Sequence, residues 1–174
     1  MKVTALFIAA IVLLDWSLQA VCGDAVYNLI EPGISLGEIH IGQKEDSVKA
    51  LPGMSKYLMS RDIVVQYSDD GDVTEIMTIS HYFKTNHGIT TRSSATAFRK
   101  LFPSAQLTCT IDRGVSGIST SRIYDNIDSG IAFSTDTLSS HGRKDSVNII
   151  TVHRKNTPVS IFGEIIDCAK PIVP

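Results

Sequence analysis

The sequence lacks several of the short motifs that usually mark an enzyme. Its 174 residues contain no Ser-x-x-Lys pair, no His-Glu-x-x-His zinc motif and no glycine-rich phosphate loop. They also contain no Asn-x-Ser/Thr glycosylation site, because Asn156-Thr157 is followed by Pro158. The first absence favours a non-catalytic protein, although a site assembled from distant residues would leave no local motif. The second is compatible with a bacterial envelope.

Paired metal ligands are missing as well. Zinc sites usually draw two ligands from one element, whereas the five histidines stand singly, and we expect a structural or solvent role for each of them. An acidic run departs from the spacing of a calcium loop, and the glycine within it fits a turn. The sequence therefore predicts no metal and no cofactor. The histidines are His40, His81, His87, His141 and His153, and the acidic run is Asp69, Asp70, Asp72 and Glu75.

Long hydrophobic runs are confined to the N-terminus. Residues 3–14 are apolar, Lys2 precedes them, and small residues follow at Ala20 and Gly23. This layout is typical of a secretory signal peptide over residues 1–23, and the run is too short for the roughly 20 apolar residues that span a bilayer. We expect a periplasmic or secreted protein that begins near Asp24, without a membrane span after cleavage. Acylation of Cys22, as in a lipoprotein, is the alternative.

Cysteine is scarce, with three residues in the chain. If cleavage removes Cys22, Cys109 and Cys168 remain, and two cysteines in an oxidising compartment usually pair. The predicted disulfide would close a loop of about 60 residues and stabilise the fold by roughly 4 kcal/mol on the chain-entropy model. Two buried free thiols are the other interpretation.

The remaining chain has the composition of a globular protein. Hydrophobic residues make up 43% and charged residues 20% of the sequence, which is enough for one sizeable core or two small ones. A weak internal repeat indicates two tandem modules. The segment from Gly33 to Gly53 recurs at a shift of fifty positions, each time as a short strand, a polar turn and a short helix. The matched pairs are Ile39 with Ile89, Ile41 with Thr91, Val48 with Phe98, and Leu51 with Leu101.

Hydrophobic spacing and turn residues extend each copy into a module. We predict an α+β fold of two tandem modules, residues 24–87 and 88–174, each with a short helix packed on an antiparallel sheet. Residues 63–67 and 72–79 form a hairpin around Asp70-Gly71. Ser93 or Ser94 caps the second helix. A strand follows at 107–111, then a loop at 112–121, a second hairpin of 130–134 with 146–153, and an apolar tail from Pro158 that should pack.

The two modules carry opposite charge. Residues 24–80 have ten acidic and four basic residues, a balance of −6, and residues 88–155 have five acidic and nine basic residues, a balance of +4. The charges either attract the modules to each other or present a bipolar surface to a partner. In the second case the candidate partner-binding residues are Asp69, Asp70, Asp72 and Glu75. Nucleic acid is disfavoured, because the basic residues of the second half are not interleaved with aromatic residues.

The repeat and the hairpin together resemble a known superfamily. Ile41-Gly42-Gln43-Lys44 with Val48, and more loosely Thr91-Arg92-Ser93 with Phe98, are similar to the turn and helix of β-lactamase inhibitor proteins and of the small lipoprotein in the β-barrel assembly machinery. The resemblance implies an exported, non-catalytic protein that binds another protein through its sheet face and loops, as an inhibitor or adaptor. A small envelope hydrolase and a structural envelope lipoprotein are the alternatives.

Overall fold

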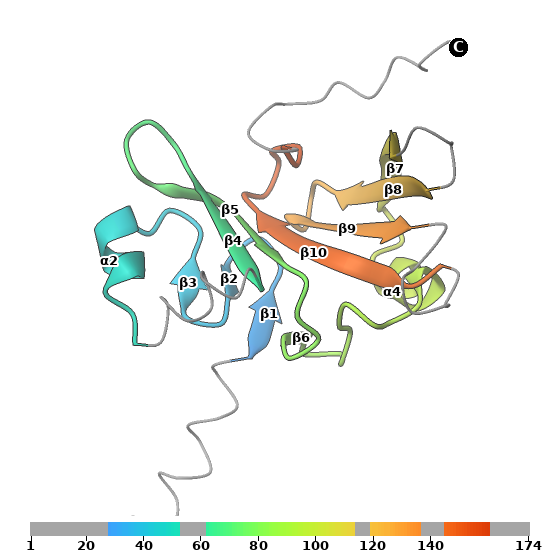
Figure 1. Ribbon diagram of the computed structural model, residues 1–174, viewed down its shortest axis with the longest axis horizontal. Helices are drawn as coiled ribbons and strands as arrows, with labels where there is room; N and C mark the ends of the chain where they lie inside the picture. Colours follow the sequence, from blue (N-terminus) through green and yellow to red (C-terminus); the bar gives the residue numbers. More distant parts are fainter. Residues whose placement is uncertain (1–27, 53–61, 114–118, 137–144, 161–174) are drawn as a thin grey trace, which may run out of the picture.

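The computed structural model describes residues 28–52, 62–113, 119–136 and 145–160. These residues form two sheets and two helices, so the predicted α+β class is correct (Figure 1). The smaller sheet has the order β3-β2-β1-β6. We expected a purely antiparallel sheet. Strand β1 does pair antiparallel with β2, but it pairs parallel with β6. Its strands are β1 (Leu29–Glu31), β2 (Ser35–Leu36), β3 (Ile39–His40) and β6 (Lys84–Thr85).

The larger sheet has six antiparallel strands in the order β4-β5-β10-β9-β8-β7. Strand β5, from the first half of the chain, pairs with β10, from the second half. The two halves therefore share one sheet. Its strands are β4 (Ile63–Tyr67), β5 (Val73–Thr78), β7 (Gln106–Arg113), β8 (Ser119–Asn126), β9 (Ile131–Asp136) and β10 (Val147–His153).

Both predicted hairpins are present. In the turn between β4 and β5, the amide of Gly71 donates to the carbonyl of Ser68 at 2.9 Å, and Gly71 has a φ of 76°. A residue with a side chain is strained in that conformation, which is why Asp-Gly predicted the turn. Strands β9 and β10 form the second predicted pair.

The two helices differ in their side-chain caps but share the backbone bonds at their starts. In α4 (Ala95–Leu101) the Ser94 hydroxyl accepts a hydrogen bond from the Ala97 amide at 3.1 Å, which is the predicted cap. Helix α2 (Glu45–Lys49) has no side-chain cap. Backbone bonds tie each helix start to the beginning of a strand of the large sheet. They run from Glu45 N to Gly71 O and Val73 N to Gln43 O at α2, and from Ala95 N to Asp145 O and Val147 N to Ser93 O at α4.

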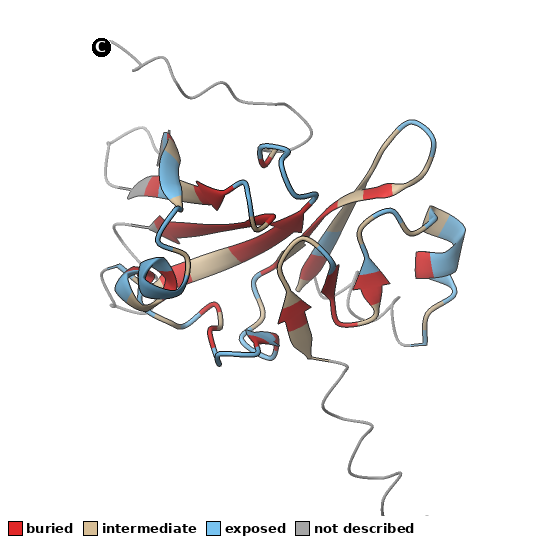
Figure 2. Cartoon of the chain, turned by 180° about the vertical axis from the view of Figure 1, so that it is seen from behind, coloured by how far each residue is buried: buried red, intermediate tan, exposed pale blue. Residues whose placement is uncertain are grey.

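One hydrophobic core serves both halves of the described chain. Val48 of α2 and Phe98 of α4 are both 0% exposed and belong to the same cluster of buried side chains. The Phe98 ring lies 4.0 Å from the ring of Phe133 on β9, measured between centroids. Figure 2 shows β9 and β10 largely buried behind α4, whose outer surface is exposed. The described residues therefore do not form two separate small cores.

The loop predicted at residues 112–121 is wrong at both ends, while residues 114–118 lie outside the described ranges. Asp112 and Arg113 end β7, and residues 119–121 begin β8, a strand the sequence did not reveal. Strand β8 has neighbours on both sides, so backbone hydrogen bonds to β7 and β9 hold its polar residues in a strand. Residues 81–87, at the end of the first predicted module, contain β6 and the buried Phe83.

Gly130, at the start of β9, is expected to tolerate no side chain. Its φ is 71°, and a Cβ atom there would meet the His153 carbonyl and lie 2.6 Å from the Gly33 Cα. We expect Gly130→Ala to lower the free energy of unfolding by more than about 2 kcal/mol. Gly71→Ala is the control, because it adds a Cβ in open space at a similar φ of 76° and costs only the backbone strain of about 1–2 kcal/mol. Urea denaturation measures both, and equal losses would contradict the expectation.

Candidate functional site

The structure separates the four acidic residues proposed for partner binding. Asp69 and Asp70 lie exposed at the tip of the β4–β5 hairpin. Asp72 forms an ion pair with Lys44, with 2.7 Å between Oδ1 and Nζ. Glu75 is only 4% exposed and lies within the sheet. The hairpin tip thus presents two free-standing carboxylates and one paired carboxylate, and Glu75 belongs to a different site.

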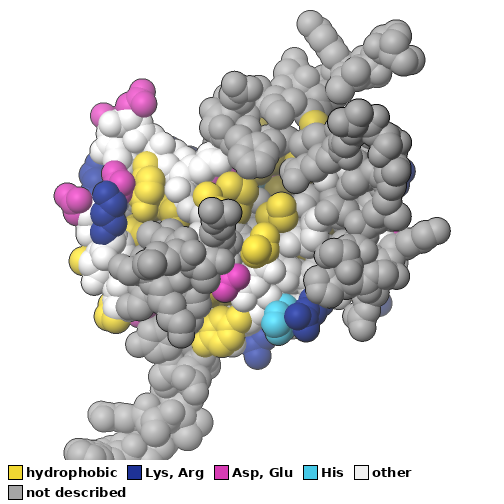
Figure 3. Space-filling view, in the orientation of Figure 1, with side chains coloured by type: hydrophobic (Ala, Val, Ile, Leu, Met, Phe, Trp, Pro, Cys, Tyr) yellow, Lys and Arg dark blue, Asp and Glu magenta, His cyan; other side chains and the backbone are white. Residues whose placement is uncertain are grey.

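One face of the large sheet is not covered by α4. We call it the open face, and it is the face turned toward the viewer in Figure 1. Register across the strands places Val64, Met77, Thr151 and Ala132 in one row on this face. In Figure 3, hydrophobic side chains gather in the middle of it and acidic side chains gather at the hairpin tip.

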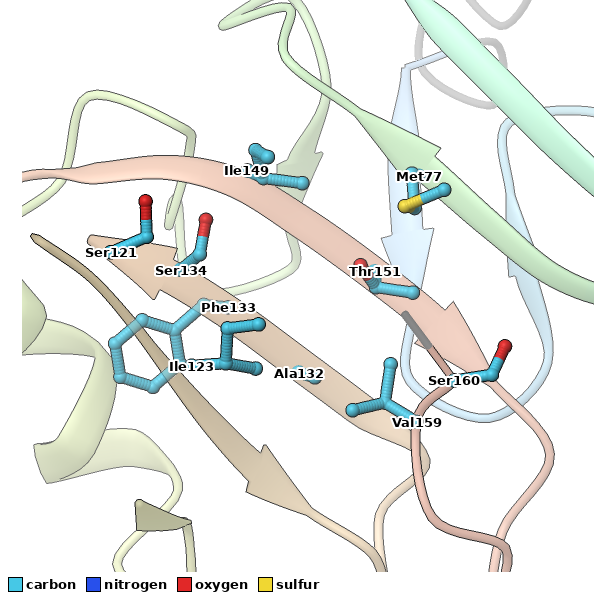
Figure 4. Close-up of a pocket in the computed structure, with 10 residues that line it drawn as sticks. All are labelled: Met77, Ser121, Ile123, Ala132, Phe133, Ser134, Ile149, Thr151, Val159 and Ser160. Atoms are coloured by element: carbon cyan, nitrogen blue, oxygen red, sulfur yellow. The ribbon is translucent and has the colours of Figure 1, made fainter. Parts of the chain in front are cut away.

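A hollow lies on the open face, with an empty volume of about 510 Å³ that includes open solvent. Apolar side chains and hydroxyl groups line it. Ser121 and Ser134 stand together at one end, and Val159 and Ser160 close the other (Figure 4). Between them the floor comes from β5, β8, β9 and β10. The full lining is Met77, Ser121, Ile123, Ala132, Phe133, Ser134, Ile149, Thr151, Val159 and Ser160.

Next to the hollow lies a group of buried ionisable side chains, which we call the carboxylate–histidine cluster: Glu75, Asp125 and His153. Each is 4% exposed or less. Glu75 and His153 are partners across β5 and β10. His153 Nε2 lies 3.0 Å from Asp125 Oδ1, and His153 Nδ1 lies 3.0 Å from the Arg154 carbonyl oxygen. Both ring nitrogens therefore face acceptors.

The environment raises the pKa of His153 above its ordinary value of 6.5. Burial by itself lowers this pKa, because it penalises the charged ring. The hydrogen bond and the charge of Asp125, the Arg154 carbonyl and the charge of Glu75 act in the opposite direction and together outweigh burial. The imidazolium form fits the contacts, since only that form donates from both nitrogens.

Burial also raises the pKa of Glu75 above its ordinary value of 4.5, and the charge of Asp125 adds to the effect. Hydrogen bonds from Ser160 and the charge of His153 oppose it. Glu75 Oε2 is buried and has no hydrogen-bond partner among the described residues. An ionised carboxylate normally fills both oxygens with donors when buried, so Glu75 is held in a setting that favours its protonated form.

The cluster binds the segment that follows β10, residues 154–160, which we call the strap. Asp125 Oδ2 accepts a hydrogen bond from the Val159 amide at 2.9 Å, and Glu75 Oε1 accepts one from the Ser160 amide. The Ser160 hydroxyl lies 3.0 Å from Gln66 Oε1. Two consecutive backbone amides of the strap are thus held by two carboxylates of the sheet.

This cluster is not arranged as a catalytic triad. A nucleophile needs a free histidine nitrogen within hydrogen-bond reach, whereas both nitrogens of His153 are engaged and the side chain is 1% exposed. Ser160, the serine whose amide bonds Glu75, donates its hydroxyl to Gln66. This geometry instead supports a structural role, in which the cluster holds the strap against the sheet.

The residues 33–37 spell Gly-x-Ser-x-Gly, a nucleophile pattern that the sequence reasoning missed. Register places Glu31, Ser35 and His40 side by side on three strands. Ser35 is 2% exposed, however, and its hydroxyl donates to Glu31 Oε2 at 3.0 Å rather than to His40. The pattern also lies in a two-residue strand followed by another strand, whereas a nucleophile elbow joins a strand to a helix. Ser35 is a buried structural residue.

The sequence predictions about export and cysteines rest largely on residues outside the described ranges. The expected signal peptide, Cys22 and Cys168 lie there, while Cys109 is buried in β7 at 7% exposure. The Cys109–Cys168 disulfide therefore stays a prediction. Of the tail, the structure describes Val159, which packs as expected. Within the described ranges, no helix has the length and hydropathy needed to cross a membrane.

Comparisons of the chain with protein-family models, with curated proteins and with solved structures give no match.

Proposed function

We propose that this protein is an exported, non-catalytic protein-binding module, an inhibitor or adaptor that holds its partner on the open face of the large sheet. The observation that carries the proposal is the hollow, in which apolar side chains from four strands lie beside the hydroxyls of Ser121, Ser134 and Ser160. Apolar walls with a few placed polar groups are typical of sites that receive a protruding side chain. Val64, 47% exposed, extends the apolar row to the edge strand β4.

The charge around the hollow indicates the chemistry of the partner. Asp69 and Asp70 are exposed at the hairpin tip beside the open face. A partner loop with an apolar side chain for the hollow and a Lys or Arg for the hairpin would complement both features. The carboxylates would act mainly on the association rate and its salt dependence, while the apolar contact would set the lifetime of the complex.

We further propose that the two halves are copies of one helix-and-sheet module, related to the inhibitor superfamily that the sequence resembles. The matching backbone bonds at the starts of α2 and α4 support this, since Glu45 and Ala95 occupy equivalent positions at a shift of fifty. So do Val48 and Phe98, each fully buried on its helix. No described observation favours the hydrolase over a binding protein.

We expect Met77→Lys to weaken partner binding strongly. Met77 is half-buried in the floor of the hollow, so a charged side chain there would fill the space and oppose an apolar or cationic occupant. The partner is first identified by retention on the immobilised mature protein. Its affinity for the purified wild type and variant is then measured by calorimetry, with a loss of at least about tenfold expected.

Leu107→Lys is the matched control. Leu107 is 53% exposed on β7, opposite Tyr124, whose ring stacks on Phe133 on the helix-bearing face. This change adds the same charge to the same sheet away from the hollow and should leave the affinity unchanged. Loss of binding in both variants, or in neither, would refute the assignment of the open face.

A further inference from the structure

The strap is bonded to the sheet at both of its ends. At its start, the Arg154 carbonyl oxygen lies 3.0 Å from His153 Nδ1. At its finish, the Val159 and Ser160 amides donate to Asp125 and Glu75. His153 Nε2 in turn lies 3.0 Å from the same Asp125. One imidazole ring therefore connects the two ends of the strap.

A count of donors shows why protonation matters. The Arg154 carbonyl and the Asp125 carboxylate are both acceptors, so the ring must donate from both nitrogens to satisfy them. A neutral ring has one N–H and leaves one of the two contacts as a pair of facing lone pairs. At a side chain that is 1% exposed, water does not replace the lost donor without opening the strap.

We propose that His153 is a proton-controlled catch, which holds the strap closed as an imidazolium and loosens it on losing the proton.

The charged groups around the ring fit this role. Asp125 faces it from β8 and Glu75 from β5, and the Gly130 carbonyl, just before β9, accepts a hydrogen bond from the His153 amide at 3.0 Å. The charged side chains of the strap itself, Arg154 and Lys155, are exposed. A neutral ring would leave the buried Asp125 carboxylate without its counter-charge, which adds to the cost of the lost hydrogen bond.

Movement of the strap would alter the hollow, since Val159 and Ser160 form one of its ends. Through the catch, the shape of the open face thus depends on pH, because it depends on the protonation of His153. The catch is a property of the chain alone and holds whether or not the hollow binds a partner.

Hydrogen exchange tests the catch on the mature protein without a ligand. The amide protection of Val159 and Ser160 is followed by NMR from about pH 5 to 9, together with the ring carbon shift of His153, whose ordinary pKa is about 6.5. We expect protection at both amides to fall by about ten- to a hundredfold in step with deprotonation of His153. The Ile150 amide in the middle of β10 should keep its protection. Titration of His153 without a change at Val159 and Ser160 would overturn the proposal.

Two variants separate the catch from a general pH effect. His81→Gln removes an exposed histidine and should retain the transition. His153→Gln removes the titrating group and should leave protection at Val159 and Ser160 low and independent of pH. A transition that persists in His153→Gln would assign the effect to another group and refute the catch. If that variant does not fold, the wild-type titration decides alone.

Discussion

Phe98→Ala is expected to lower the free energy of unfolding by about 3–5 kcal/mol. The Phe98 side chain is 0% exposed, and its ring packs between two others. Centroid distances are 4.0 Å to Phe133 on β9 and 4.7 Å to Phe102 at the end of α4. Truncation removes these contacts and leaves a cavity between the helix and the sheet, which the surrounding backbone fills only in part.

Urea denaturation of the mature protein measures this loss, and the melting temperature should fall by roughly 2–4 °C for each kcal/mol. Leu101→Ala provides the control, because Leu101 lies on the same helix and is 36% exposed. It changes the helix propensity little and should cost less than about 1 kcal/mol. Similar losses in the two variants would mean that α4 is not anchored through Phe98.

The same variant tests whether the two halves unfold together. Phe98 shares one cluster with Val48 and Ile30 from the first half of the chain, and β5 pairs with β10 between the halves. A shared sheet and core predict a single unfolding transition that shifts as a whole. If Phe98→Ala instead splits the transition, the modules are separately stable units.

The sequence predicted the features whose cause is local. Asp70-Gly71 fixes its own turn, because only the glycine takes the required φ without strain. Ser94 caps α4 through an amide three residues ahead. Val48 and Phe98 are buried because each lies on the apolar stripe of its helix.

Strand β8 was missed because its cause is not local. Its first half, Ser119 to Arg122, has no apolar alternation, so no period-two pattern is visible. Backbone bonds to β7 and β9 decide its conformation, and these need the topology first. The parallel pairing of β1 with β6, more than fifty residues apart, escaped prediction for the same reason.

The carboxylate–histidine cluster shows the same limit at the level of a site. Glu75, Asp125 and His153 lie far apart in sequence, and each alone looks like a solvated strand residue. One signal was present in the β5 sequence. Glu75 lies between the apolar Val73 and Ile76 in a strand that is buried on both faces over much of its length, so it was a poor choice for an exposed acidic patch.

Asp125→Ala is the second change for which we expect a large effect, a loss of about 3–5 kcal/mol of unfolding free energy at about pH 6. Asp125 is buried and accepts hydrogen bonds from the His153 ring and the Val159 amide. Its removal leaves a buried imidazolium without its closest counter-charge. Asp128→Ala is the control, since Asp128 is exposed in the turn that follows β8, three residues further along the chain, and it should cost less than about 0.5 kcal/mol.

The pH dependence distinguishes a lost ion pair from a simple cavity. In the wild type, the raised pKa of His153 stabilises the fold below 6.5, and that contribution is lost as pH rises through the higher folded-state pKa. Glu75 has the same sign from pH 4.5 upward, because its folded-state pKa is also raised. Without Asp125, the two largest contributions that raise the pKa of His153 are lost, so we expect burial to lower this pKa and the variant to gain stability as pH rises toward 6.5. The difference between wild type and Asp125→Ala should therefore shrink above pH 6.5 in urea denaturation, and a difference that is constant across that range would show that Asp125 acts by packing alone.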